Sequence, residues 1–302
     1  MLLPSPMALL PRSPIDRANA VRRVLGGLLV ANLAVVGAKL VIGLSARSLA
    51  VLGDALHSTL DALNNVLALV VIRVASKAPD EDHPYGHGKF ETLGALLIVG
   101  FMSITCFELV QDAIGRLGGG AASTPPTLSD TQLAVLVGTL GVNVLVAWYE
   151  TRRGQELDSD LLLADAAHTR ADVFITVGVL IGMLLSRRGW WWVDPVLALL
   201  IALFIVRIAY RILQRAVPVL VDARAIPDTT IQALAESVTG VKSAYGIRSR
   251  GGTGPQPSYA EVTIAVDRRA NVEAAHAIAD AVEDRLKRDL RLNEVTVHVE
   301  PC

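Results

Sequence analysis

The chain is poor in charged residues, aromatic residues and cysteine. Only 19% of its 302 residues are charged and 5% are aromatic, whereas 52% are hydrophobic and the mean hydropathy is +0.46. Soluble domains carry about 25% charged residues, so this composition favours a membrane protein. A net charge of −1 produces no strong field of one sign, and we therefore expect no nucleic-acid partner.

Cysteine is too scarce for a disulfide framework or a zinc knuckle. Cys106 lies inside an apolar run, Cys302 is the last residue, and no CxxC motif occurs. The opening segment, residues 1–20, is interrupted by four prolines, which leave no apolar stretch of signal-peptide length. We expect this segment to be a flexible cytosolic tail.

Six apolar stretches are long enough to cross a bilayer as helices, because a core about 30 Å thick needs roughly 20 residues. They cover residues 24–44, 49–76, 92–117, 133–150, 161–186 and 193–213. Lysine and arginine concentrate in the tail, in the second-to-third and fourth-to-fifth connections, and after the last stretch. We predict an all-α transmembrane domain of six helices over residues 21–220, with both termini cytoplasmic and, by default, in a prokaryotic inner membrane.

Beyond residue 220 charged residues become frequent, and the periodicity predicts the order helix, strand, strand, helix, strand. In the last strand Val295, Val297 and Val299 alternate with polar residues. Three strands covered by two helices form a plausible two-layer unit. We predict a small cytosolic α+β domain over residues 221–302, of the αββαβ type found in metallochaperone and ferredoxin-like folds.

An eight-residue motif occurs in both the second and the fifth apolar stretch. Its ionisable positions are Asp54, His57 and Asp61 in the first copy and Asp165, His168 and Asp172 in the second. Spacings of three and four place these side chains along one helical face. Ionisable groups at membrane depth are costly and normally face a partner, a cavity or an ion. Asp54 and Asp165, one turn earlier than the histidines, could support the ligands or line an entry path.

The predicted metal ligands are His57, Asp61, His168 and Asp172. A His and an Asp four residues apart lie roughly 5–6 Å from each other at Cβ, so each pair can share one ion. Two imidazoles and two carboxylates suit tetrahedral Zn²⁺ and also admit Co²⁺, Fe²⁺ or Cd²⁺, whereas Mg²⁺ and Ca²⁺ prefer more oxygen ligands. The alternative is a polar network that only joins helices, and the duplication argues against it.

A second group of candidate ligands lies in the second-to-third connection, which reads Asp-Glu-Asp-His-Pro-Tyr-Gly-His over residues 80–87. His83 and His87, with one or more of the acids, could bind metal where the ion enters. A solvated acidic loop is the equally open alternative.

Together these features resemble the cation diffusion facilitator family, whose members exchange cytosolic divalent metal for protons. The resemblance rests on six spans, HxxxD in the second and fifth, a His-Pro-Tyr-Gly-His-Gly-Lys segment over residues 83–89 and a C-terminal cytosolic domain. It implies a homodimeric transporter, and not an enzyme, that exports zinc through the duplicated His and Asp site. The metal is cargo, and no organic cofactor is expected.

The resemblance also implies roles for residues outside the duplicated motif. Asp80, His83 and His87 match the family's loop site. Lys89 matches a lysine that pairs with an acid just after the sixth helix, where this chain has Asp222. Such a pair would hold the membrane helices together at the dimer interface.

In the C-terminal domain, to which the resemblance assigns dimerisation and regulation, His276, His298 and Glu300 match metal-site positions. Tyr245 and Thr263 stand where well-studied members carry further histidines. His298 and Glu300 could therefore simply form the solvent face of a strand.

The choice of cargo depends on His57, because bacterial zinc exchangers of the family carry Asp at that position and animal zinc carriers carry His. This replacement should favour Zn²⁺ over the larger Cd²⁺. Fe²⁺ and Mn²⁺ are the main alternatives, and two imidazoles argue more strongly against Mn²⁺. An intramembrane metalloenzyme would need an open water position, and no HExxH motif occurs. A metal-responsive membrane scaffold that transports nothing is a further alternative.

Overall fold

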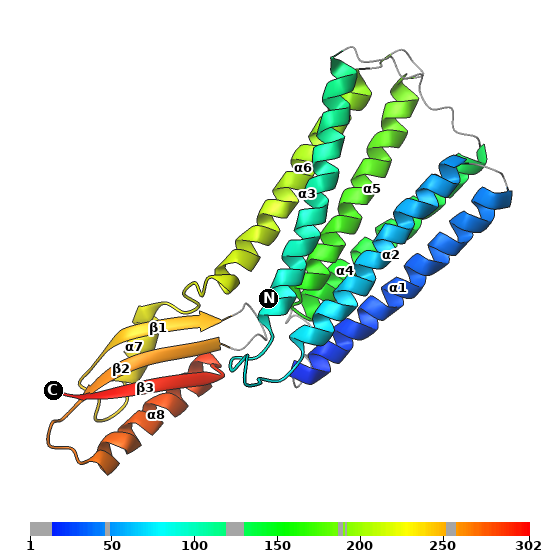
Figure 1. Cartoon of the computed structure of the whole chain (residues 1–302). Helices are drawn as coiled ribbons and strands as arrows, with labels where there is room; N and C mark the ends of the chain where they lie inside the picture. The colour runs from blue at the N-terminus through cyan, green and yellow to red at the C-terminus, as the bar shows by residue number, and fades with distance from the viewer. Residues whose placement is uncertain (1–13, 46–48, 119–129, 187–189, 191, 252–257) are drawn as a thin grey trace, which may run out of the picture. The chain divides into compact units, whose positions relative to one another are not determined.

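The computed structural model describes residues 14–45, 49–118, 130–186, 190, 192–251 and 258–302. These residues form two compact units, Met1–Ala216 and Val217–Cys302. The first unit is helical and the second contains a sheet (Figure 1). The division falls a few residues before the boundary expected at residue 220, inside the last long helix.

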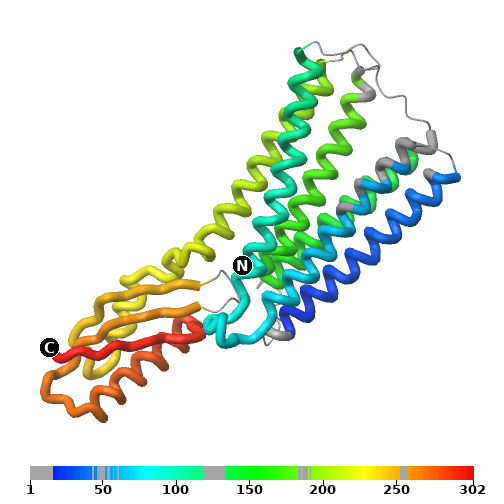
Figure 2. The backbone as a smooth tube through the Cα atoms, viewed as in Figure 1, coloured from blue at the N-terminus to red at the C-terminus, as the bar shows by residue number. Residues whose placement is uncertain are grey.

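Six long helices follow one another through the first unit, as the backbone trace in Figure 2 shows. They are α1 (Pro14–Ser45), α2 (Leu49–Ala75), α3 (Lys89–Leu117), α4 (Asp130–Glu156), α5 (Asp160–Ser186) and α6 (Val193–Leu220). Helix α1 packs along α2, while α5 packs against both α3 and α4. Helices α2 and α5, which carry the two copies of the motif, therefore belong to one bundle.

Four helices in the described part of the chain are long and apolar enough to cross a membrane. These spans are Asp16–Ile42, Lys89–Leu117, Leu133–Glu156 and Val193–Leu220. Helices α2 and α5 are of similar length but fall outside this set. Parts of α2 and α5 lie outside the described residues, so this result does not test either helix as a membrane span. The crossing of the membrane by all six helices therefore stays a prediction.

The first helix begins earlier than the expected end of the tail. Residues 14–20 are helical, whereas the sequence placed them in a flexible segment; residues 1–13 lie outside the described part. Proline is tolerated in the first turn of a helix, so Pro14 does not prevent this start. Ala18 and Val21 are buried within the bundle, and their packing stabilises the added turns.

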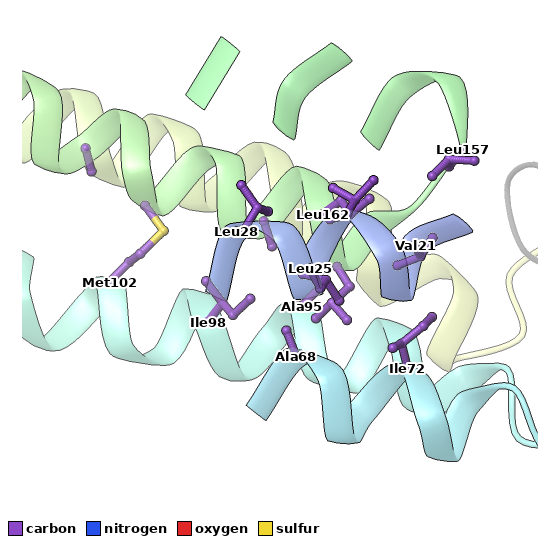
Figure 3. Close-up of a cluster of buried hydrophobic side chains, with 14 of the residues drawn as sticks. Val21, Leu25, Leu28, Ala68, Ile72, Ala95, Ile98, Met102, Leu157 and Leu162 are labelled. Atoms are coloured by element: carbon purple, nitrogen blue, oxygen red, sulfur yellow. The ribbon is translucent and has the colours of Figure 1, made fainter. Parts of the chain in front are cut away.

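Apolar side chains from several helices form one core in the helical unit (Figure 3). Leu25 of α1, Ile72 of α2, Met102 of α3 and Leu162 of α5 are all 2% exposed or less. Gly94 permits the close approach of α2 and α3, because a Cβ there would lie 2.5 Å from Cγ1 of Val71.

The second unit contains α7 (Asp228–Glu236), β1 (Ser243–Gly251), β2 (Ser258–Val266), α8 (Val272–Leu290) and β3 (Glu294–Pro301). The strand order is β1-β2-β3; β1 and β2 are antiparallel, and β2 and β3, which α8 connects, are parallel. Ile231 of α7 and Leu286 of α8 pack with Ile264 of the sheet. The predicted αββαβ order and α+β class are confirmed.

Candidate metal centre

Helices α2 and α5 bring three of the predicted ligands together. Nε2 of His168 lies 3.5 Å from Oδ1 of Asp61 and 3.7 Å from Oδ2 of Asp172. One ligand atom from each of the three residues lies within 4.8 Å of the others. Asp61 comes from α2 and the other two from α5, so this cluster depends on the packing of two helices that are distant in sequence.

The spacing of these atoms suits a small cation. Ligand atoms bonded at about 2.1 Å to a tetrahedral ion lie about 3.4 Å apart. The measured separations of 3.5 and 3.7 Å are close to that value. An ion could therefore bind between the three side chains without a large movement of either helix.

The other two members of the first motif copy, Asp54 and His57, are placed by their backbone alone. Both are helical in α2, but their side chains lie outside the described part. His57 precedes Asp61 by one helical turn, which puts both on one face of α2. The role of His57 as the fourth ligand stays a prediction.

Two asparagines of α2 also reach the second motif copy. Nδ2 of Asn64 lies 3.5 Å from Nε2 of His168. Asn32 donates a hydrogen bond of 2.6 Å to Oδ1 of Asn65. Nδ2 of Asn65 in turn donates a hydrogen bond of 2.9 Å to Oδ2 of Asp165. Asp165 is thus held by α1 and α2 at a position one turn before His168, and its support of the ligands stays a prediction.

Two buried ionisable residues near the motif were missed by the sequence analysis. Glu150 is 1% exposed and accepts a hydrogen bond of 3.1 Å from Oγ1 of Thr169. Lys39 is 4% exposed and donates a bond of 2.8 Å to Oγ of Ser58. A charge-bearing residue inside an apolar helix was the available signal. The fourth predicted stretch ended at residue 150, so Glu150 looked like a terminal residue, but α4 continues to Glu156.

The loop between α2 and α3 forms a second cluster. Asp80 lies 3.1 Å from Nδ1 of His83 and 3.3 Å from Nε2 of His87, and the two imidazole centroids are 4.3 Å apart. Desolvation acts to raise the pKa of Asp80, but hydrogen bonds from His83 and attraction to both histidines outweigh it and lower that pKa. Asp80 is therefore held as a carboxylate, the form that binds metal.

His87 is the buried member of this loop cluster. Its side chain is 5% exposed, and its Nδ1 atom has no hydrogen-bond partner among the described residues. Gly86 precedes it with φ +80°, a left-handed conformation that favours glycine. The turn thereby directs His87 inward beside Asp80, and the cluster has the compactness of a cation site.

The candidate site in the C-terminal domain is not assembled in the described part of one chain. His298 lies 3.5 Å from Glu300, but His276 pairs with Asp280 of its own helix at 3.6 Å. Tyr245 donates a short hydrogen bond to Glu300. The three predicted residues are not among the ligand clusters that the described residues form.

The two residues of the predicted ion pair at the dimer interface, Lys89 and Asp222, lie in different units. Lys89 is the first residue of α3, and Asp222 follows α6. Asp222 lies 3.6 Å from Nη1 of Arg250 within its own unit. The pairing of Lys89 with Asp222 at a dimer interface stays a prediction.

Two family models together match nearly the whole chain. Residues 28–221 match the cation efflux transmembrane domain, and residues 227–302 match the cytoplasmic domain of cation efflux proteins. A solved MamM CTD is 32% identical over 24% of this chain and 91% of that chain, with a TM-score of 0.23.

Full-length relatives agree with these matches. The manganese efflux system protein MneS of Bacillus subtilis (strain 168) is 29% identical over 95% of this chain and 99% of its own length. The cation-efflux pump FieF of Shewanella oneidensis is 28% identical over 87% of this chain and 88% of its own. The uncharacterised transporter YdbO of Bacillus subtilis is 32% identical over 87% and 89%. The chain belongs to the cation diffusion facilitator family, and it is a membrane transporter of divalent metal cations, not an enzyme.

Proposed function

We propose that the protein exports Zn²⁺ from the cytosol in exchange for protons, through a site made by His57, Asp61, His168 and Asp172. The observation that carries this proposal is the convergence of one imidazole and two carboxylates from α2 and α5 within 4.8 Å. His57 would add a second nitrogen donor one turn before Asp61. Two nitrogen and two oxygen donors match the ligand set and number that Zn²⁺ prefers.

Proton exchange follows from the chemistry of these ligands. Histidine must be neutral and carboxylates ionised to bind metal, so protons compete with the ion for the same lone pairs. Metal binds when the site faces the less acidic cytosol and leaves when protons take its place. The loop cluster of Asp80, His83 and His87 would receive the ion before it enters the bundle.

We further propose that two copies assemble through the C-terminal domain, each with its own transport site. The match of this domain to the cytoplasmic domain of cation efflux proteins supports an assembly outside the bilayer. Both termini would then lie on the cytosolic side, as the distribution of lysine and arginine indicates.

Mn²⁺ is the second candidate cargo. The relative MneS is a manganese efflux system protein by name, and its match covers almost the whole chain. The Asn64 side chain near His168 could also turn its amide oxygen toward an ion, and oxygen ligands suit Mn²⁺ better than they suit Zn²⁺.

Transport by purified protein in liposomes tests both proposals. External Zn²⁺, Mn²⁺, Fe²⁺ and Cd²⁺ are offered in competition, and internal pH is followed with a trapped dye. We expect Zn²⁺ to give the highest flux, accompanied by proton movement in the opposite direction. A preference for Mn²⁺ would transfer the proposal to the second cargo, and metal flux without proton movement would exclude exchange.

The choice of variants assigns the flux to the proposed site. Asp172→Asn and the His57→Ala, His168→Ala double variant should abolish metal flux. Asp112→Asn is the matched control, because Asp112 is an exposed carboxylate of α3 that pairs with Arg116 at 2.7 Å. Flux that survives in the double histidine variant would remove the proposed site.

A further inference from the structure

A cavity of about 540 Å³ opens on the surface of the α4 and α5 pair, apart from the metal centre. Its lining combines apolar and basic side chains. The apolar part includes Val144, Trp148 and Phe174, each 41% exposed or more, and the polar part includes Arg152, Gln155 and Arg170. A membrane-facing surface normally presents apolar side chains alone, so two arginines in such a groove need an explanation.

The depth of Arg170 makes its position unusual. It lies ten residues beyond Asp160, the first residue of α5, which places its Cα about 15 Å along the helix. Its Nε donates a hydrogen bond of 3.1 Å to the carbonyl of Ala166, so the side chain turns back toward the start of α5. Arg152 stands four residues before Glu156, where α4 ends. The guanidinium groups of Arg152 and Arg170 therefore both lie at the part of the groove nearer the α4–α5 connection.

The groove has a basic end and an apolar end, as a site for an amphiphilic molecule would. Its basic end lies toward the α4–α5 connection, and its apolar end, with Val144 and Phe174, lies farther along both helices. Arg152 also stands over the ring of Trp148, with 5.7 Å from its Cζ to the ring centroid. Basic pockets between membrane helices on the cytoplasmic side suit anionic lipid headgroups.

Nearby acids do not close the groove to an anion. Glu156 lies 3.0 Å from Arg152 and 2.7 Å from Arg153, and Glu150 accepts a bond from Thr169, but neither acid lines the cavity. A second copy of the same face is a poor occupant, because a two-fold axis through the groove would bring the arginines of each copy against each other.

From this arrangement we infer that the groove between α4 and α5 binds an anionic phospholipid, with the phosphate at Arg152 and Arg170 and an acyl chain along Trp148 and Phe174. Arg170 lies between His168 and Asp172 in the sequence, and a spacing of two residues places it on the opposite face of α5 from these ligands. The lipid would thus contact the outer face of the helix whose inner face holds the cargo.

Trp148 provides a direct readout of lipid in the groove. The other tryptophans occupy positions 190–192, so changing those three to Phe leaves Trp148 as the sole tryptophan. The protein is reconstituted in phosphatidylcholine vesicles that contain a minor fraction of brominated phosphatidylglycerol or, in parallel, the same fraction of brominated phosphatidylcholine. Bromine quenches tryptophan fluorescence on contact, and we expect the anionic lipid to quench more strongly.

The variants decide whether the arginines cause this difference. Arg152→Gln and Arg170→Gln should each lower the quenching by phosphatidylglycerol toward the level given by phosphatidylcholine. Arg153→Gln should retain the full difference, because Arg153 pairs with Glu156 and does not line the groove. Arg152 is 64% exposed, so its variant retains the fold even if Arg170→Gln does not.

Three results would overturn the inference. Equal quenching by the two lipids would show no preference for a negative headgroup. If phosphatidylglycerol still quenched more strongly in the Arg152→Gln variant and in the Arg152→Gln, Arg170→Gln double variant, the preference for the anionic lipid would not arise from this groove. Quenching by neither lipid would show that protein covers Trp148, as in a contact with a second copy.

Discussion

Arg17 of α1 and Glu91 of α3 form a bidentate ion pair, with Nη1 to Oε2 at 2.8 Å and Nη2 to Oε1 at 3.0 Å. The two side chains are only 11% and 3% exposed. Arg17 also donates hydrogen bonds of 2.7 and 2.8 Å to the carbonyls of Leu157 and Asp158, beyond the end of α4. This cluster joins α1, α3 and the α4–α5 connection at one end of the bundle.

Glu91→Gln should lower the stability of the helical unit. Removing one charge of a buried pair leaves the other uncompensated, which costs about 3–5 kcal/mol. Ser159, which donates a bond of 2.5 Å to Glu91, would also lose a charged acceptor. The expected result is a fall in the thermal unfolding midpoint of the purified protein, measured by tryptophan fluorescence.

Arg23→Gln is the control for this change, because Arg23 is exposed on α1 and bonds only weakly to the carbonyl of Asn19, at 3.4 Å. Its unfolding midpoint should stay close to that of the unchanged protein. Equal midpoints for Glu91→Gln and Arg23→Gln would show that the ion pair contributes nothing to stability.

The ion pair also shows what could not be predicted from sequence. Arg17 and Glu91 are 74 residues apart; Arg17 lies in the expected tail and Glu91 just before the third apolar stretch, where charged residues are ordinary. Periodicity reports the face of a single helix and carries no information about a partner on another helix. Arg17 was therefore placed in a tail, although its bonds to Glu91, Leu157 and Asp158 add to the packing that holds the first turns of α1.

The duplicated motif was informative for the opposite reason. An ionisable group inside an apolar helix is costly, so its presence alone indicates a partner, and two copies with the same Asp, His and Asp spacing indicate a shared one. Sequence spacing alone therefore groups His57, Asp61, His168 and Asp172, of which the structure describes the last three side chains together. It does not add Asn64 or Glu150 to them, because an amide or an acid near the end of an apolar stretch also fits ordinary packing.

Asn65→Leu should weaken metal binding without removing a proposed ligand. Asn65 is 2% exposed and links Asn32 to Asp165, one turn before His168. Loss of a residue bonded to a ligand typically costs 10- to 100-fold in metal affinity, and we expect a smaller loss here because Asn65 acts through Asp165, which is not a proposed ligand. Isothermal titration of the purified protein with Zn²⁺ measures it.

Thr139→Val is the matched control for Asn65→Leu, because Thr139 bonds only to the carbonyl of Val135 in its own helix, at 2.7 Å. Its affinity for Zn²⁺ should be unchanged. If Asn65→Leu binds Zn²⁺ as tightly as this control, the chain from Asn32 to Asp165 does not support the metal centre.

His87→Ala should remove a metal ion from the loop. The Nδ1 atom of His87 is buried without a hydrogen-bond partner among the described residues, and its Nε2 atom faces Asp80 at 3.3 Å. In an Asp172→Asn background, which disables the site between α2 and α5, the remaining bound Zn²⁺ should fall on His87→Ala. Equilibrium dialysis followed by elemental analysis gives the stoichiometry.

Asp82→Asn provides the comparison, because Asp82 is an exposed acid of the same loop that lies outside the cluster. It should leave the stoichiometry unchanged. If Asp82→Asn and His87→Ala lower it equally, the loop attracts cations only through its net charge, as a solvated acidic segment would.

Tyr245 should ionise at a higher pH than an ordinary tyrosine. Its hydroxyl donates to Glu300, and this hydrogen bond, together with desolvation and repulsion between the carboxylate and a tyrosinate, raises the pKa of Tyr245 above 10.0. The bond needs the phenolic proton, so its contribution to stability is complete below the ordinary pKa and is lost as pH rises through the raised one. Ultraviolet titration of the protein, with Tyr245→Phe subtracted, isolates this group.

Glu300→Ala should return the pKa of Tyr245 toward its ordinary value, whereas Glu261→Ala should not, because Glu261 lies 3.8 Å from Arg248 on the neighbouring strand and does not bond the tyrosine. The hydrogen bond from Tyr245 uses Oε2 of Glu300, whereas Nε2 of His298 lies 3.5 Å from Oε1, so the bond leaves one carboxylate oxygen beside His298. If Glu300→Ala left the titration of Tyr245 unchanged, the hydrogen bond would not exist in solution.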